Sequence, residues 1–174
     1  PGYADERLRC MMGRKTKNLP VRDELLILTN GKRSEKNYFE ALRANYSTIY
    51  QITVRFLNSD PLKLVKCAVK QKSVANRVWC VCDKDEFTDE SIYQAMDLAK
   101  TNGIGVAFSN AAFEVWLIDH FKMFETEKDA DSLQVILDKL LKENGYSKGY
   151  AKNDAEVITK VFLPLLDDAV QNAD

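Results

Sequence analysis

The stretch Val-Trp-Cys-Val-Cys-Asp-Lys-Asp at residues 78–85 decides the fold of this chain. Its β-branched and aromatic residues predict a buried strand that ends in two aspartates. Because side chains alternate along a strand, Asp83 and Asp85 lean to one side while Lys84 points away. The carboxyl ends of strands in an open parallel α/β sheet face the ligand crevice. Two carboxylates there repel each other and predict a bound Mg²⁺ or Mn²⁺. The alternative is a helix N-cap followed by a solvated turn.

Strands and helices alternate on both sides of this stretch. Further strands are predicted at residues 24–29, 50–57 and 104–108. Helices between them are predicted to start after the N-cap Ser34, at Pro61 and near residue 89. This order predicts an α/β fold with a mostly parallel four-stranded sheet flanked by helices. A buried helix over 111–121, an amphipathic helix over 131–143 and a last helix over about 154–173 complete the prediction.

Length and composition indicate one domain. The chain has 174 residues, of which 45% are hydrophobic and 29% are charged, which is enough apolar material for a core. We divide it into a basic N-terminal arm (1–22), an α/β core (23–125) and a helical C-terminal extension (126–174) of the same domain. The net charge of −1 provides no overall field toward nucleic acid, so any such field is local. The arm either binds nucleic acid or is a leader that orders against its own domain.

The cysteines give no metal-binding pattern. The four of them form no C-x-x-C and the chain has one histidine, so a structural zinc site is not expected. Cys80 and Cys82 fall in the apolar strand and are interpreted as small buried side chains. There is no signal-peptide pattern and no apolar run near about 18 residues. We therefore expect a cytoplasmic protein without membrane contact.

Polar residues follow three of the four predicted strands. Asn30-Gly31 follows the first, Asp83 and Asp85 end the third, and Ser109-Asn110 follows the fourth, just before a helix that carries Glu114. The carboxyl ends of parallel strands meet at one edge of the sheet, so these residues are expected to lie together. Glycine at this turn lets the backbone approach a phosphate. The sequence therefore predicts a phosphate and metal site at this edge.

Three motifs at these positions resemble those of the RloB-like proteins of the TOPRIM superfamily. The family's C-E-G-E-x-T-E-x-x-Y-F stands as Thr-Asn-Gly-Lys-Arg-Ser-Glu-Lys-Asn-Tyr-Phe at 29–39, and its D-x-D follows Trp79. Its S-N-P-x-F-E-x-W-L-x-x-H-F stands as Ser-Asn-Ala-Ala-Phe-Glu-Val-Trp-Leu-Ile-Asp-His-Phe at 109–121. A weaker tyrosine-lysine element is similar to residues 146–148. The resemblance spans about residues 22–150.

The resemblance implies a TOPRIM-like fold and divalent-metal-dependent cleavage of nucleic acid, RNA or DNA. It also implies a role in antiviral defence or a restriction-linked locus, commonly beside an ATPase partner. Carried over to this sequence, the resemblance implies that Asp83 and Asp85 bind the metal. The candidate site combines them with residues chosen for their chemistry. Its catalytic residues are Asn30, Asp83, Asp85, Glu114 and Lys148, and its phosphate-binding residues are Gly31 and Lys32.

Two of these positions depart from the family pattern. Asn30 stands where the family has its acid/base glutamate, and Lys32 replaces the second acidic residue. Asparagine cannot exchange a proton at neutral pH, and a general acid or base contributes about 10²–10⁴-fold in rate. Glu35 or Glu114 could supply a substitute carboxylate. Three outcomes follow as hypotheses: an active nuclease, a degenerate sensor subunit that binds nucleic acid or nucleotide without cutting, and a purely structural subunit.

Single residues each allow two interpretations. Glu114 lies in an apolar helix, so it either binds a ligand or forms an ion pair that holds the helix. His120 is interpreted as a satisfied core histidine rather than a catalytic one. Lys148 and Lys152 either stabilise transition-state charge or are solvated loop residues. Asn110 is expected to cap the helix that follows it.

Overall fold

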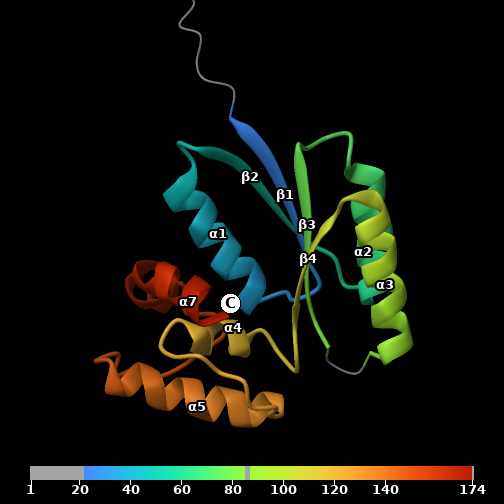
Figure 1. Cartoon of the computed structure of the whole chain (residues 1–174). Coiled ribbons are helices and arrows are strands. Elements are labelled where there is room, and N and C mark those ends of the chain that lie inside the picture. Colours follow the sequence, from blue (N-terminus) through green and yellow to red (C-terminus); the bar gives the residue numbers. More distant parts are fainter. Residues whose placement is uncertain (1–21, 85–86, 174) are drawn as a thin grey trace, which may run out of the picture.

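The computed structural model describes residues 22–84 and 87–173, and Figure 1 shows its layers. Four strands form one fully parallel sheet in the order β2-β1-β3-β4. The strands are β1 (Asp23–Thr29), β2 (Tyr50–Phe56), β3 (Arg77–Asp83) and β4 (Gly105–Ser109). The predicted α/β class and its four-stranded sheet are confirmed, and the sheet is parallel throughout.

Three helices connect the strands. They are α1 (Ser34–Tyr46), α2 (Pro61–Gln71) and α3 (Asp89–Asn102). Helix α1 packs on one face of the sheet, and α2 and α3 pack side by side on the other (Figure 1). Asp60 caps α2 with Pro61 in its first turn, and Gly103 ends α3 with a φ of 63°. The sequence therefore predicted the starts of two of the three helices closely.

The expected N-cap at Ser34 is wrong by one position. Helix α1 already includes Ser34, and Arg33 takes the capping place without a side-chain hydrogen bond. The Ser34 hydroxyl lies instead 3.1 Å from the hydroxyl of Tyr150, which is far away in the sequence. A long-range partner has replaced the local backbone contact that capping propensity assumes.

Helix α4 (Glu114–Asp119) follows β4 within the α/β core, and α5 (Ala130–Glu143) is the first helix of the extension. Helix α4 is shorter than the predicted 111–121, because residues 110–113 form a bend that turns Phe113 into the core, 5.7 Å from the Tyr38 ring. The predicted last helix is a continuous helical segment of changing type. It consists of α6 (Ala155–Val157), the π-helical turn η1 (Ile158–Phe162), the 3-10 turn η2 (Leu163–Leu165) and α7 (Leu166–Ala173). Pro164 lacks a backbone N–H, so a regular α-helical ladder cannot pass through it.

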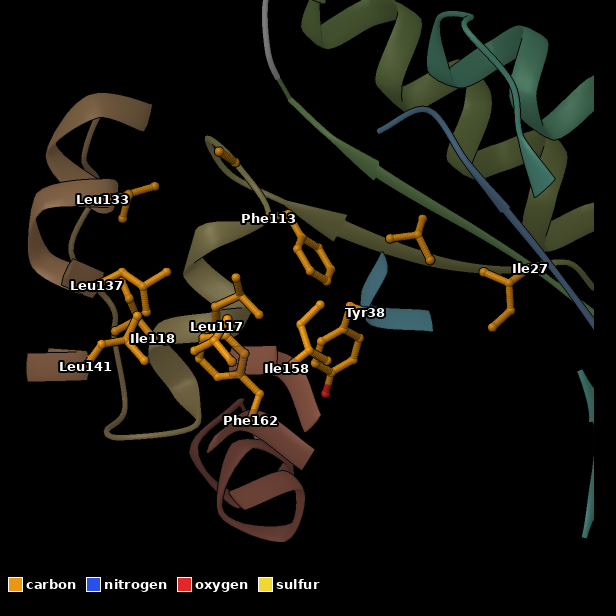
Figure 2. Packing of buried hydrophobic residues seen from close by; sticks show 13 residues of the cluster. Ile27, Tyr38, Phe113, Leu117, Ile118, Leu133, Leu137, Leu141, Ile158 and Phe162 are labelled. Atoms are coloured by element: carbon orange, nitrogen blue, oxygen red, sulfur yellow. The ribbon is translucent and has the colours of Figure 1, made fainter. Parts of the chain in front are cut away.

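Two hydrophobic clusters lie on the two faces of the sheet. The α2 and α3 face buries Cys80 and Cys82, both free thiols, as expected for small core side chains. On the α1 face, Ile27 and Tyr38 belong to one cluster with Leu117 of α4, Leu137 of α5 and Phe162 of η1. Figure 2 shows these side chains gathering from the sheet, α1 and the extension. None of the helices in the described ranges combines the length and apolar character that crossing a bilayer requires.

Candidate active site

The candidate site lies where the crossovers of the sheet diverge. β1 and β3 are neighbours, but the chain leaves β1 for α1 on one face and leaves β3 for α3 on the other. Such a switch point opens a crevice at the carboxyl edge of a parallel sheet. The Asn30 N–H donates to the Val81 carbonyl at 3.3 Å and ties the turn after β1 to β3. Asp83 pairs with Ser109 in the register, so the three predicted strand ends do meet at this edge.

Gly31 provides the close approach at this edge. A Cβ placed on Gly31 would lie 1.8 Å from Oε1 of Glu35, so the Glu35 carboxylate rests against the Gly31 backbone. The Gly31 N–H donates to Thr29 Oγ1 at 3.0 Å, which fixes the turn. We expected the small residue to admit a phosphate, and in the structure it admits a carboxylate. The phosphate-binding roles of Gly31 and of the exposed Lys32 remain predictions.

Glu35 is the carboxyl group of the crevice on which the charges of Asp83, Glu114 and Lys152 all act. It is only 5% exposed, and burial is the main cause that raises its pKa from 4.5 to about 7. The negative charges of Asp83 and Glu114 raise this pKa further, while its own backbone N–H and Lys152 lower it. Carboxyl groups from α1, β3 and α4 therefore interact at the switch point. Of the two substitute carboxylates that the sequence offered, Glu35 is the one packed against Gly31.

Glu114 is held by a second set of contacts. It is 1% exposed, and its Oε1 accepts a hydrogen bond from the Tyr150 hydroxyl at 2.8 Å and an ion pair from Lys152 Nζ at 3.2 Å. Burial and the Glu114 charge both raise the pKa of Tyr150, which keeps this phenol protonated as a donor. Glu114 therefore forms the ion pair that was one of its two interpretations. The pair lies beside the carboxyl groups of Glu35 and Asp83.

The loop over residues 144–154 brings Tyr150 and Lys152 to this position. The Tyr150 N–H donates to Asp138 Oδ1 of α5 at 2.9 Å. Gly149 has a φ of 74°, and a Cβ there would lie 2.0 Å from the same oxygen. Only glycine combines this backbone conformation with such a close contact. Helix α5 therefore positions the loop, and the loop positions the partners of Glu114.

Asn30 contributes an unsatisfied acceptor. Its Oδ1 is buried, and no hydrogen-bond partner for it exists among the residues that the structure describes. A buried carbonyl oxygen without a donor is unfavourable unless it meets water or a cation. An amide oxygen is a ligand that Mg²⁺, Ca²⁺ and Mn²⁺ accept. The residue that cannot exchange protons can thus still coordinate a hard cation.

The structure brings together only part of the predicted catalytic set. Asn30, Asp83 and Glu114 share the crevice, whereas Lys148 is exposed and pairs with Glu156 at 2.6 Å. Asp85 lies outside the described residues. Within residues 22–84 and 87–173, no group of three or more His, Cys, Asp or Glu side chains is arranged to hold a metal ion. A complete ligand set at this edge would therefore need Asp85, the Asn30 amide oxygen or groups of the substrate.

His120 takes the structural role that we expected. It is buried, its Nε2 lies 3.0 Å from the Tyr38 hydroxyl, and its Nδ1 lies 2.9 Å from the Trp116 carbonyl. Burial lowers its pKa to about 4, so the ring is neutral at physiological pH. It joins α1 to α4 beneath the crevice.

The fold and this edge define a class: an open, fully parallel α/β protein with buried carboxylates at its switch point. The chain belongs to the RloB-like protein family, whose family model matches residues 25–174. No curated protein and no solved structure matches the chain. The family match confirms the resemblance to RloB-like proteins, and it continues beyond residue 150 to residue 174.

Proposed function

We propose that this protein is a divalent-metal-dependent nuclease of the TOPRIM type that acts in antiviral defence or at a restriction-linked locus. The observation that carries the proposal is the meeting of Glu35, Asp83 and Glu114 at the switch point. Glu35 and Glu114 are buried, and the negative charges of Asp83 and Glu114 help to raise the pKa of Glu35. Negative charges that gather in this way favour a dication. Phosphodiester cleavage uses such an ion against the phosphate charge.

Asp83 and Asp85 would hold Mg²⁺ or Mn²⁺, and the unsatisfied Asn30 Oδ1 fits a third ligand position. When bound, the ion supplies Lewis-acid stabilisation of the phosphate and of the leaving oxygen. Lys32, exposed on the same turn, would attract the phosphate backbone.

Glu35 would hold and transfer the proton that Asn30 cannot. Its carboxyl group lies against Gly31, one residue from the position of the family's acid/base glutamate. Lys152 holds Glu114 in the ion pair described above, which places a cation at the edge of the cluster. Lys152 would face a phosphate at this site, a role that the sequence analysis also proposed for Lys148.

The double substitution Asp83→Asn with Asp85→Asn tests the proposal. We expect Mn²⁺-dependent cleavage of nucleic acid to fall to background. The uncharged amides of the variant cannot balance the positive charge of the ion, so the ion binds weakly. Asp97→Asn, on the exposed surface of α3, is the matched control and should cut like the parent. A double variant that cuts at the parent rate would disprove the assignment.

A second candidate function is a sensor subunit that binds nucleic acid or nucleotide beside a defence ATPase and does not cut. Asn30 and Lys32 favour it, because they remove two acidic residues of the family motif. Asn30→Glu combined with Lys32→Glu separates the two functions. Cleavage gained only in this variant would identify a degenerate enzyme. Binding without cleavage in both forms would support the sensor.

A further inference from the structure

A large cavity opens on the α1 face of the sheet, beside the candidate active site. Its volume is about 760 Å³, within the range of pockets that bind small ligands. Its floor is formed by side chains of β1, β3 and β4, and its walls come from α1, α4 and the segment after α4. Seven aromatic side chains line it. They are Tyr38, Phe39, Trp79, Phe108, Phe113, Trp116 and Phe124.

Trp79 is placed as a platform rather than as a core residue. Its neighbours Val78 and Cys80 are buried on the opposite face, yet Trp79 itself is 43% exposed. A Cβ on Gly105 would lie 2.4 Å from Cδ2 of Trp79, so the indole lies directly over the Gly105 backbone of β4. Glycine at this position lets the ring lie flat on the sheet and leaves a face of the ring open to the cavity.

Polar groups accompany the aromatic lining. Asp119 is 6% exposed and lines the cavity, and burial raises its pKa to about 6, partly offset by a backbone hydrogen bond from Phe124. Its backbone carbonyl accepts a hydrogen bond from Asn172 Nδ2 at 2.7 Å, which ties it to α7. A carboxylate near neutral pH is an acceptor only, so it favours a ligand that carries N–H donors. Aromatic faces with a few polar groups are the means by which proteins bind unstacked bases.

The cavity adjoins residues that border the candidate active site. Ser109 and Asn110 line it, and Ser109 pairs with Asp83 in the register of β3 and β4. Phe113 also lines it, directly before Glu114 in the chain. A nucleotide whose phosphate lies at the carboxylates would therefore have its base beside this opening.

We propose that this cavity binds an unstacked base of a single-stranded nucleic acid, held on Trp79 and selected by Asp119 for an exocyclic amino group. The proposal rests on the proposed function, since it names the substrate class of the same edge. The position of the cavity next to Asp83 and Glu114 favours a nucleotide over a protein segment as the occupant. Cytosine, adenine and guanine carry the amino donor and uracil does not.

Binding in EDTA tests this proposal apart from catalysis. Fluorescence anisotropy with labelled single-stranded oligo(dC) and oligo(dU) gives the affinities of the full chain. Trp79→Ala should weaken oligo(dC) binding about 5- to 150-fold, the range for loss of one stacked base. The control Tyr93→Ala, exposed on α3 of the opposite face, should leave it within about twofold of the parent.

Asp119→Asn supplies a second readout that a folding defect does not imitate. The parent should prefer oligo(dC) to oligo(dU), and this variant should lose the preference because an amide can donate as well as accept. Equal affinity of the parent for both oligonucleotides, or unchanged binding by Trp79→Ala, overturns the proposal. If Trp79→Ala instead dissociates a dimer in sedimentation while oligonucleotide affinity is unchanged, a second copy covers the cavity and the proposal also fails.

The cleavage assay distinguishes the two proposals. If Trp79→Ala loses binding but the parent never cuts, the base site stands and the nuclease assignment falls. If Trp79→Ala binds like the parent while the double aspartate variant loses cleavage, the nuclease stands and the base site falls.

Discussion

At the scale of single residues, Glu35 links the stability of the fold to its chemistry. The carboxyl group is buried against Gly31 and interacts with Asp83 and Glu114. A buried carboxyl group next to other negative charges destabilises the folded state when it is ionised. Glutamine at this position would avoid that cost, because its side chain carries no charge. The presence of Glu35 in the crevice is the kind of local cost that functional sites carry.

Glu35→Gln should change how stability depends on pH. The folded pKa of about 7 lies above the ordinary 4.5, so the folded state binds more protons than the unfolded state between these values. The stabilising contribution is complete below pH 4.5 and is lost as the pH rises through 7. Relative to Glu35→Gln, the parent should lose about 3 kcal/mol of unfolding free energy across this window.

Urea unfolding of both proteins at several pH values in EDTA measures this loss. Because Asp119 and His120 titrate equally in both, their contributions cancel in the difference. Glu143→Gln, on an exposed part of α5, is the matched control and should show a much smaller change with pH. A parent-minus-Glu35→Gln difference that is flat from pH 5 to 8 would contradict the burial argument.

The site residues that could be predicted from the sequence are those whose position follows from the residues next to them in the chain. Asp83 and Gly31 follow strands, and strand order alone brings their ends to one edge. Tyr150 and Lys152 reach Glu114 from 36 and 38 residues away in the sequence, through a loop held by α5. No local pattern encodes such a contact. The motif comparison selected Lys148 instead, which the structure pairs with Glu156.

At the scale of elements, the loop over residues 144–154 depends on α5 for its shape. Gly149→Ala and Gly145→Ala both place a side chain at a positive φ, of 74° and 87°, and each should cost about 1 kcal/mol for the backbone alone. A Cβ at Gly145 meets no atom within 4 Å, whereas at Gly149 it meets Asp138 Oδ1 at 2.0 Å. Gly149→Ala should therefore cost roughly 1 to 3 kcal/mol more than Gly145→Ala.

Thermal and urea unfolding of the two variants measure this difference. Gly149→Ala should also reduce cleavage or binding, since its loop carries Tyr150 and Lys152 to Glu114. Equal destabilisation by the two substitutions would show that Asp138 moves aside freely and does not anchor the loop.

Sequence patterns predicted whether a segment is a helix or a strand better than they predicted where each helix begins and ends. Asp60 with Pro61 and Gly103 act through neighbours in the chain, so α2 and α3 were predicted closely. The length of α4 depends on the packing of Phe113 against Tyr38, which is a tertiary contact. The change of helical type around Pro164 is a consequence of the missing N–H, but its form depends on Phe162 remaining in the core.

At the scale of the whole molecule, the extension and the sheet share one hydrophobic cluster. Ile27 of the sheet belongs to it together with Leu137 of α5 and Phe162 of η1 (Figure 2). Val81 of β3 is a further member of the cluster. The RloB-like match from residue 25 to 174 likewise runs through both parts. Cooperative unfolding of both parts is therefore the expectation, in line with the assignment of the extension to the same domain.

Phe162→Ala tests this cooperativity. Phe162 is fully buried and stacks edge-to-face against His120 at 5.2 Å, so its removal should cost about 3 to 5 kcal/mol. In a Trp116→Phe background tryptophan fluorescence reports Trp79 on the sheet alone. This fluorescence and far-UV circular dichroism should show coincident transitions at lower urea. Val170→Ala, half-exposed on α7, should shift neither. Early loss of helical signal while the fluorescence midpoint stays in place would show that the extension unfolds independently, and Tyr150 and Lys152 would then be supplied by a separately folding unit.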